Sequence, residues 1–211
     1  MTRALFGADP KESGDIFLDG EEIRINRPID SIKSGIVLVP EDRKRDGLCT
    51  KLSIKDNISL PNLDLLTSKM GVVNRKKENE ITEETVKNLT IRLTNSDANA
   101  ESLSGGNQQK VVVGKWLARD SRVVIFDEPT RGIDVAAKVE IYNLMNELKD
   151  QGIGVLFVSS EMQEILGISD RILVMADGKI TKELDIEEAT QDIILEYATK
   201  FDRKIEMKKE A

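Results

Sequence analysis

A run of apolar residues that ends in two acids is the feature that most constrains this chain. Val123–Phe126 has the composition of a buried strand, and Asp127 and Glu128 follow it directly. A carboxylate at the C-terminal edge of such a strand can hold Mg²⁺ through water, and a second one can orient or deprotonate an attacking water. Because side chains alternate along a strand, we expect these two to point to opposite sides and to take different roles. The alternative is a strand end whose acids cap the following loop.

Several classes of function are excluded by the composition. The 211 residues contain no histidine, which excludes His-based acid–base chemistry, Ser/His/Asp triads and His-ligated metal sites. The formal net charge of −7 argues against a nucleic-acid-binding protein whose affinity depends on a basic face. Cys49 is the single cysteine, so we expect a reducing compartment. No apolar run approaches the roughly 20 residues that cross a bilayer, so we expect a soluble protein that, if it serves a membrane, does so as a peripheral partner.

The first half of the chain predicts a hairpin, a strand and a helical insertion. The expected elements are two short strands within Ile16–Ile23 around an Asp19-Gly20 turn, a buried strand over Ile36–Val39 that Pro40 ends, and helices from Ser53 to about Asn95, the clearest of them over Lys76–Leu93. The change from apolar strands to polar, helix-forming segments indicates an inserted helical lobe.

From Ser104 onward the pattern alternates between helices and strands. The expected elements are helices over Lys110–Ala118, Met162–Leu166 and Glu187–Lys200, strands over Val123–Phe126 and Gly154–Val158, and a hairpin of Arg171–Met175 and Lys179–Thr181. One more helix should bury a face that carries Val135, Val139, Tyr142, Met145 and Leu148. Apolar strands separated by helices predict an α/β fold with a largely parallel sheet that is covered on both faces.

Two short motifs could contribute to a site beside the acids. Ser104-Gly105-Gly106 opens a helix, where glycine amides, the helix dipole and a serine hydroxyl can all bind an anion. The alternative is an ordinary capped helix start. Pro129–Asp134 supplies a rigid turn that ends in an acid before the next helix, and Asp134 alone could equally be a normal N-cap.

These motifs together resemble those of ABC-transporter ATPases. Leu103–Lys110 looks like the signature motif, Val123–Glu128 looks like the Walker B strand, and Pro129–Asp134 resembles the D-loop. Together with the Pro40–Leu48 segment upstream, the sequences of these motifs are most similar to those in the second nucleotide-binding domain of bacterial ribose, galactose and xylose importers. The resemblance implies a P-loop-NTPase-like α/β core over residues 1–52 and 101–211, with a helical subdomain over residues 53–100.

The resemblance also implies roles for individual residues. Asp127 would help to hold Mg²⁺, and Glu128 would be the general base. Ser104, Gly105 and Gly106, with Gln108 beside them, would bind the γ-phosphate of an ATP held by an opposing domain. The remaining implied roles are metal and water contact for Glu41 at the Q-loop position, dimer contact for Asp134, and phosphate sensing for Ser160 at the switch position.

Three departures from the family pattern change what we expect. Ser160 stands where the family usually has histidine, and Glu41 replaces a glutamine amide with an acid, so we expect a degenerate hydrolytic site. The third departure is the phosphate loop, since no GxxxxGK[ST] motif occurs in the sequence. By resemblance, the Thr2–Gly7 segment would finish the helix that follows that loop, so we expect a chain truncated at its N-terminus that binds ATP weakly or not at all by itself.

Two readings of the function stay open at this point. The first is the C-terminal ATPase domain of a sugar importer, cytoplasmic and peripheral on the inner face of the cell membrane. Its partners would be an N-terminal or partner ABC ATPase domain, membrane permease subunits and, indirectly, a periplasmic or extracellular sugar-binding protein. The second is a non-catalytic module that supplies the signature motif to a composite site. A soluble ABC ATPase of DNA repair or translation is disfavoured by the acidic pI near 4.9, and the sequence does not identify the sugar.

Overall fold

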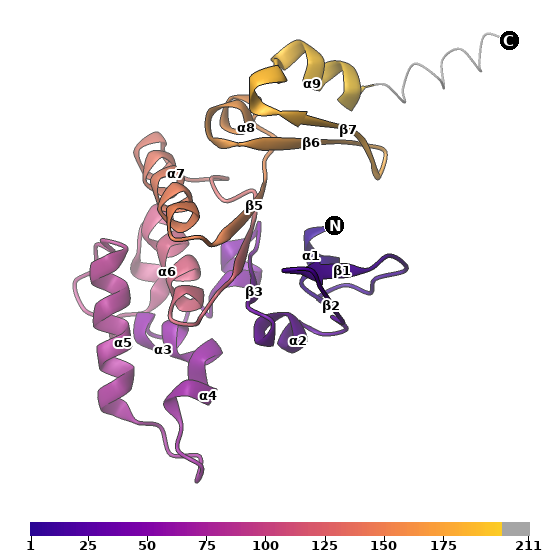
Figure 1. Ribbon diagram of the computed structural model, residues 1–211. Coiled ribbons are helices and arrows are strands. Elements are labelled where there is room, and N and C mark those ends of the chain that lie inside the picture. The colour runs from indigo at the N-terminus through magenta and orange to yellow at the C-terminus, as the bar shows by residue number, and fades with distance from the viewer. Residues whose placement is uncertain (200–211) are drawn as a thin grey trace, which may run out of the picture. The chain divides into compact units, whose positions relative to one another are not determined.

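The computed structural model describes residues 1–199 and divides into two compact units (Figure 1). The first unit is Met1–Val158 and the second is Ser159–Ala211, of which residues 159–199 are described. Each unit has its own strands and helices, and each is considered by itself. Within residues 1–199, none of the helices combines the length and the apolar character that a membrane span needs.

A three-stranded parallel sheet forms the centre of the first unit. Its strands are β3 (Ile36–Val39), β4 (Val123–Asp127) and β5 (Gly154–Val158), in the order β3-β4-β5. Val39, Phe126 and Phe157 lie in register across the three strands. Every residue of β3 is buried, as are the three central residues of β4, which is typical of a parallel strand with both faces covered. The α/β fold with a parallel sheet is thereby confirmed.

A small hairpin and three short helical elements accompany this sheet. They are α1 (Thr2–Leu5), β1 (Ile16–Leu18), β2 (Glu21–Ile23), α2 (Pro28–Lys33) and the π-helical turn η1 (Arg43–Gly47). The predicted hairpin is confirmed, since β1 and β2 pair antiparallel and Asp19 and Gly20 both have positive φ, at 52° and 83°. Such a pair of residues matches the twist of the two strands.

The inserted segment is helical, but its longest helix is shorter than predicted. Its elements are α3 (Ile54–Ser59), η2 (Leu60–Asn62), α4 (Leu63–Leu66), α5 (Arg75–Asn88) and η3 (Ala100–Ser102). The expected helix over Lys76–Leu93 was wrong at its C-terminal end. Thr90 has a φ of +49°, so the chain reverses there and brings Leu89 and Ile91 into the interior, at 9% and 5% exposure. Burial of two apolar side chains thus ends the helix before its local pattern does.

Helix α6 (Gly105–Leu117) includes most of the predicted stretch Lys110–Ala118 and begins directly after Ser104, as expected for a Ser-Gly-Gly motif that opens a helix. Most of its side chains are buried. Trp116 donates its indole N–H to the Leu38 carbonyl over 3.0 Å and meets the Phe6 ring edge-on at 6.2 Å. The single tryptophan of the chain therefore reports on the packing of the first unit.

Helix α7 (Val135–Asp150) buries a different face from the one predicted. Val135 and Val139 are 78% and 50% exposed. The buried positions are Ala137, Ile141, Leu144, Met145 and Leu148. Only the C-terminal half of the expected face was correct. The helix is rotated so that Ala137 packs against α6, where a side chain on Gly106 would lie within 2.6 Å of the Ala137 Cβ, and the local pattern does not contain that contact.

The second unit is a hairpin covered by two helices. Its elements are α8 (Met162–Ile168), β6 (Arg171–Ala176), β7 (Lys179–Asp185), η4 (Ile186–Glu188) and α9 (Gln191–Ala198). The hairpin with its Asp177-Gly178 turn is confirmed. The last helix begins at Gln191 and not at Glu187, because the Thr190 hydroxyl caps it by accepting from Ile193 N–H over 3.3 Å. Lys200, its predicted end, lies outside the described residues.

Lys115 on α6 makes stability depend on pH in the alkaline range. Its ammonium donates to the Gly47 carbonyl and lies 5.1 Å from the Trp116 ring centroid. Burial lowers the pKa of Lys115 to about 8 from 10.5, against a smaller opposing effect of Cys49. Between these two values the unfolded chain binds more protons than the folded one, so the free energy of unfolding should rise as the pH rises from 8 to 10.5. The expected gain is at most about 3 kcal/mol.

Urea unfolding followed by Trp116 fluorescence at several pH values would measure this rise. Lys115→Met should flatten it, since methionine has no proton to release. Lys76→Met, at an exposed position of α5, is the matched control and should leave the slope unchanged. An equal slope in the Lys115 variant and the parent would show that another group is responsible.

Candidate functional site

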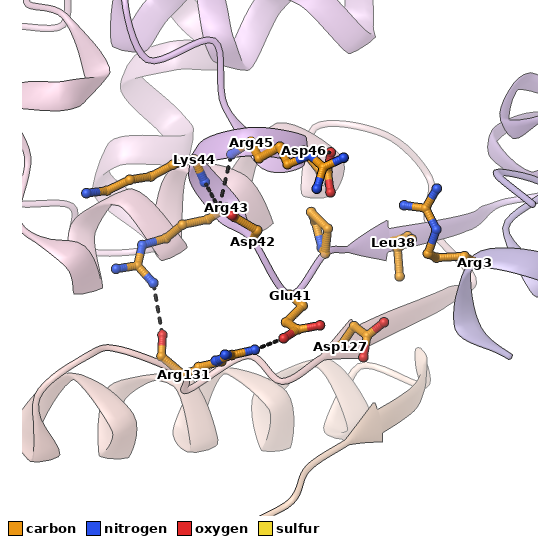
Figure 2. Close-up of a pocket in the computed structure, with 11 residues that line it drawn as sticks. Arg3, Leu38, Glu41, Asp42, Arg43, Lys44, Arg45, Asp46, Asp127 and Arg131 are labelled. Carbon is orange, nitrogen blue, oxygen red and sulfur yellow. Dashed lines mark hydrogen bonds and ion pairs between the residues drawn. The ribbon is translucent and has the colours of Figure 1, made fainter.

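The C-terminal ends of β3 and β4 meet at a charged cavity of about 560 Å³ (Figure 2). Because the two strands are parallel, the segment after Val39 and the end of β4 at Asp127 reach the same edge of the sheet. The cavity is lined by Arg3, Leu38, Pro40, Glu41, Asp42, Arg43, Lys44, Arg45, Asp46, Asp127 and Arg131. Two of the predicted metal-binding residues, Glu41 and Asp127, are therefore brought together.

Asp127 is the last residue of β4 and is half-buried. Its Oδ2 accepts a hydrogen bond of 2.6 Å from the buried hydroxyl of Thr2, at the start of α1. This contact leaves the second carboxylate oxygen at the cavity, where an oxygen ligand for Mg²⁺ would be needed. Among residues 1–199, no three Asp, Glu, Cys or His side chains form a group able to hold a metal alone. One or two carboxylates with phosphate oxygens, the usual way in which Mg²⁺ is bound, fit the residues present.

Glu128 adopts a strained backbone conformation. Its φ is +46°, in the left-handed region, and its N–H donates to the Val158 carbonyl over 2.9 Å. The expectation that Asp127 and Glu128 alternate along one strand was wrong, because β4 ends at Asp127 and the chain turns at Glu128. A non-glycine residue in this region costs of the order of 1–3 kcal/mol and is concentrated at functional sites.

Glu41 is paired with a cation. Its carboxylate forms an ion pair with the Arg131 guanidinium, which comes from the loop after β4 (Figure 2). We expected Glu41 to add negative charge beside the phosphates. The ion pair offsets that charge, although only in part, because both side chains are substantially exposed.

Arg43 was not among the predicted site residues, yet it connects three segments. It donates to the carbonyl oxygens of Arg131 and Gly132 over 3.0 and 3.2 Å, and to Gln108 Oε1 over 3.4 Å. Its Nη2 lies 2.9 Å from where a Cβ on Gly105 would be. Arg43 thus fastens the segment after β3 to the loop after β4 and to the start of α6. Nothing local in the sequence distinguishes it from Lys44 or Arg45.

The start of α6 has the properties of an anion site. Ser104 is the N-cap residue, but its side chain makes no cap hydrogen bond. Among the described residues, the N–H groups of Gly105, Gly106 and Asn107 have no acceptor. Free amides at the start of a 13-residue helix attract a negative group through the helix dipole. Gly106 is also required by packing, since a side chain there would lie 2.6 Å from Ala137 Cβ, whereas a side chain on Gly105 would displace the end of the Arg43 side chain.

The remaining predicted residues occupy different positions. Gln108 is 3% exposed, accepts from Arg43 and donates to the Ala100 carbonyl over 3.3 Å, so its side chain lies inside the unit. Asp134 caps α7 by accepting from Ala137 N–H over 3.0 Å, as its N-cap reading required. Ser160 belongs to the second unit, just before α8, and its phosphate-sensing role stays a prediction. The binding roles of Gln108 and Asp134 stay predictions as well.

Comparison with known proteins agrees with these motifs. The ABC transporter family model matches residues 1–131. The ribose import ATP-binding protein of Bacillus licheniformis is 48% identical over 199 residues, which are 94% of this chain and 40% of that protein. The xylose import ATP-binding protein of Thermoanaerobacter pseudethanolicus is 51% identical over 94% of this chain and 39% of that protein. The chain thus spans about 40% of the length of such relatives.

Solved structures show the same fold at low sequence identity. A post-hydrolysis dimer of an ATP-binding cassette bound to ADP and Pi superposes with a TM-score of 0.72 at 19% identity, over 88% of this chain and 78% of that one. Another ABC-transporter cassette superposes with a TM-score of 0.77 at 20% identity, over 92% and 80% of the two chains. At these identities the likeness concerns the fold alone.

Proposed function

Because this chain belongs to the ABC transporter family, we propose that it is an ATPase module of a sugar importer and that it supplies part of a composite ATP site. The observation that carries the proposal is the start of α6, where three amides without an acceptor among the described residues lie beside the Ser104 hydroxyl. In this proposal they donate to the γ-phosphate of an ATP whose other phosphates are held by an opposing ABC ATPase domain.

The acids at the end of β4 have separate tasks in this proposal. Asp127 and Glu41, which line one cavity, would hold Mg²⁺ together with phosphate oxygens. The bound ion neutralises charge on the phosphates. Glu128, at its strained turn, would orient and deprotonate the attacking water. Ser160 would stand where a phosphate-sensing residue is needed.

The rest of the assembly follows from the same proposal. We assign residues 1–52 and 101–211 to the nucleotide-binding core and residues 53–100 to a helical subdomain. The partners would be membrane permease subunits and, through them, a periplasmic or extracellular sugar-binding protein, and the module would work on the inner face of the cell membrane. The sugar importers among its relatives support this choice.

A non-catalytic module is the second candidate. It is favoured by the absence of histidine from the chain, which leaves Ser160 at the switch position. In that case the start of α6 would still serve an ATP held by the opposing domain, while Glu128 would contribute little to turnover. Glu128→Gln separates the two, because it should slow hydrolysis in the composite site only if this side is catalytic.

The proposal predicts an ATP-dependent complex. The partner for this experiment would come from the Bacillus subtilis ribose import ATP-binding protein, of which this chain covers 40%. The segment used would be the part of that protein that does not align with this chain. Sedimentation velocity should show a one-to-one complex with Mg²⁺-ATP and none with Mg²⁺-ADP. Ser104→Glu should weaken the complex at least about tenfold, because the added carboxylate repels the γ-phosphate. The helix itself should tolerate the change, since a negative charge is favourable at a helix N-terminus.

Two controls accompany this experiment. Ser68→Glu, at an exposed position away from α6, adds the same charge and should leave the complex intact. Calorimetric titration of the chain alone with Mg²⁺-ATP should show no binding in the micromolar range, since the sequence contains no phosphate loop. Micromolar binding by the chain alone, or a complex that forms equally well with ADP, would contradict the proposed composite site.

A further inference from the structure

Asn107 connects the first turn of α6 to the loop after α5. Its Nδ2 donates to Ser104 Oγ over 2.9 Å, and its Oδ1 accepts from the Arg92 backbone N–H over 2.8 Å. Because a backbone N–H can only donate, the Arg92 contact identifies which end of the Asn107 amide is the oxygen. The other end, which faces Ser104, is therefore the NH₂ group.

This contact determines how the Ser104 side chain is used. A serine at the N-cap ordinarily accepts from a backbone N–H in the first turn of its helix. Ser104 makes no such bond, and its oxygen accepts from Asn107 instead. Two consequences follow: the O–H hydrogen must point away from Asn107, and the amides of Gly106 and Asn107, from which an N-cap oxygen would ordinarily accept, are not occupied by the serine oxygen.

The anchor for Asn107 is itself held in place. Arg92 and Lys110 both form ion pairs with Glu140 on α7, at 3.7 and 2.8 Å. The ammonium of Lys110, which is 6% exposed, also donates to the Thr90 carbonyl over 3.2 Å. The loop after α5 is thus fastened to α6 and α7, so the Arg92 N–H is a fixed reference point for the Asn107 side chain.

We propose that Asn107 is a positioning residue that directs the Ser104 hydroxyl and leaves the first amides of α6 free, so that all of them donate to one terminal phosphate group. The inference rests on the proposed function, because the phosphate in question is that of an ATP held by the opposing domain. Asn107 acts through Ser104, and its own side-chain groups are both used within the chain. Removing its side chain lets Ser104 turn back and cap its own helix.

A titration of the whole ¹⁵N-labelled chain with sodium tripolyphosphate tests this directly. The tripolyphosphate ion presents the same terminal phosphate group as ATP. In the parent chain, the amide signals of Gly105 and Gly106 should shift as the ion binds. Asn107→Ala should weaken this binding about fivefold, the amount expected for one hydrogen bond that orients a donor. Asn146→Ala, an exposed asparagine on α7, should bind like the parent.

A double-mutant cycle separates positioning from a general structural effect. In the Ser104→Ala background, Asn107→Ala should change the affinity by less than about twofold, since the group that it positions is already absent. Equal effects of Asn107→Ala in both backgrounds would overturn the inference, and so would an unchanged affinity in the single variant. Thermal unfolding of each variant shows whether the fold is kept.

The two proposals fail in different ways. If the amide signals of Gly105 and Gly106 in the parent chain do not shift when tripolyphosphate is added, the role of Asn107 is overturned, whether or not the ATP-dependent complex forms. Coupled effects of Ser104 and Asn107 on tripolyphosphate, together with no ATP-dependent complex, would support the role of Asn107 and count against the composite ATP site.

Discussion

Phe126→Ala is expected to lower the free energy of unfolding of the first unit by about 3–5 kcal/mol. Phe126 is completely buried and lies on β4 between Val39 of β3 and Phe157 of β5. Its removal leaves a cavity in the middle of a parallel sheet whose backbone cannot close around it. Because Asp127 follows directly, the loss should also loosen the edge of the sheet at which the charged cavity lies.

Urea unfolding followed by the fluorescence of Trp116 measures this loss, since that residue packs in the same unit. Phe17→Ala is the matched control: Phe17 lies on β1 and is 63% exposed, so its substitution should change the stability by no more than about 0.5 kcal/mol. Similar losses for the two variants would contradict the assignment of β4 to the core.

Gly114→Ala should lower the free energy of unfolding by about 1–3 kcal/mol, although alanine is the better helix former. A Cβ at this position would lie 2.4 Å from Thr85 Cγ2 and 2.9 Å from Leu89 Cδ1, so α5 and α6 would have to separate. Gly114→Val, with two more methyl groups, should cost more than alanine. Chemical denaturation followed by far-UV circular dichroism would measure both.

Two further variants test the cause. Thr85→Ser removes the methyl group that the new side chain would meet, so it should recover at least half of the loss caused by Gly114→Ala. Gly167→Ala, in α8 with no atom within 4 Å of the added methyl group, should instead stabilise its helix by about 0.5–1 kcal/mol. If both glycine substitutions stabilised the protein, the close approach of α5 and α6 would be wrong.

Much of the candidate site could be predicted because its parts are local. A buried strand that ends in acids places Asp127 at the sheet edge, and a Ser-Gly-Gly helix start places free amides at α6. Glu41 could be located from the strand before Pro40 in the same way. Arg43 was not predicted because it acts through contacts with residues that are distant in sequence. Asn107 was not predicted because its bond to nearby Ser104 depends on the Arg92 N–H, which comes from the loop after α5.

The sequence by itself determined the strands, both hairpin turns, the helical character of the inserted segment and the motifs of the family. It could do so because hydrophobic alternation, turn residues and motif spacing are properties of neighbouring residues. Tertiary structure alone decided where α5 ends, which face of α7 is buried, how Arg131 pairs with Glu41, and how Asn107 holds Ser104. Each of these depends on which distant part of the chain lies alongside, and packing between elements overrides local preference wherever burial contributes more free energy than helix propensity does.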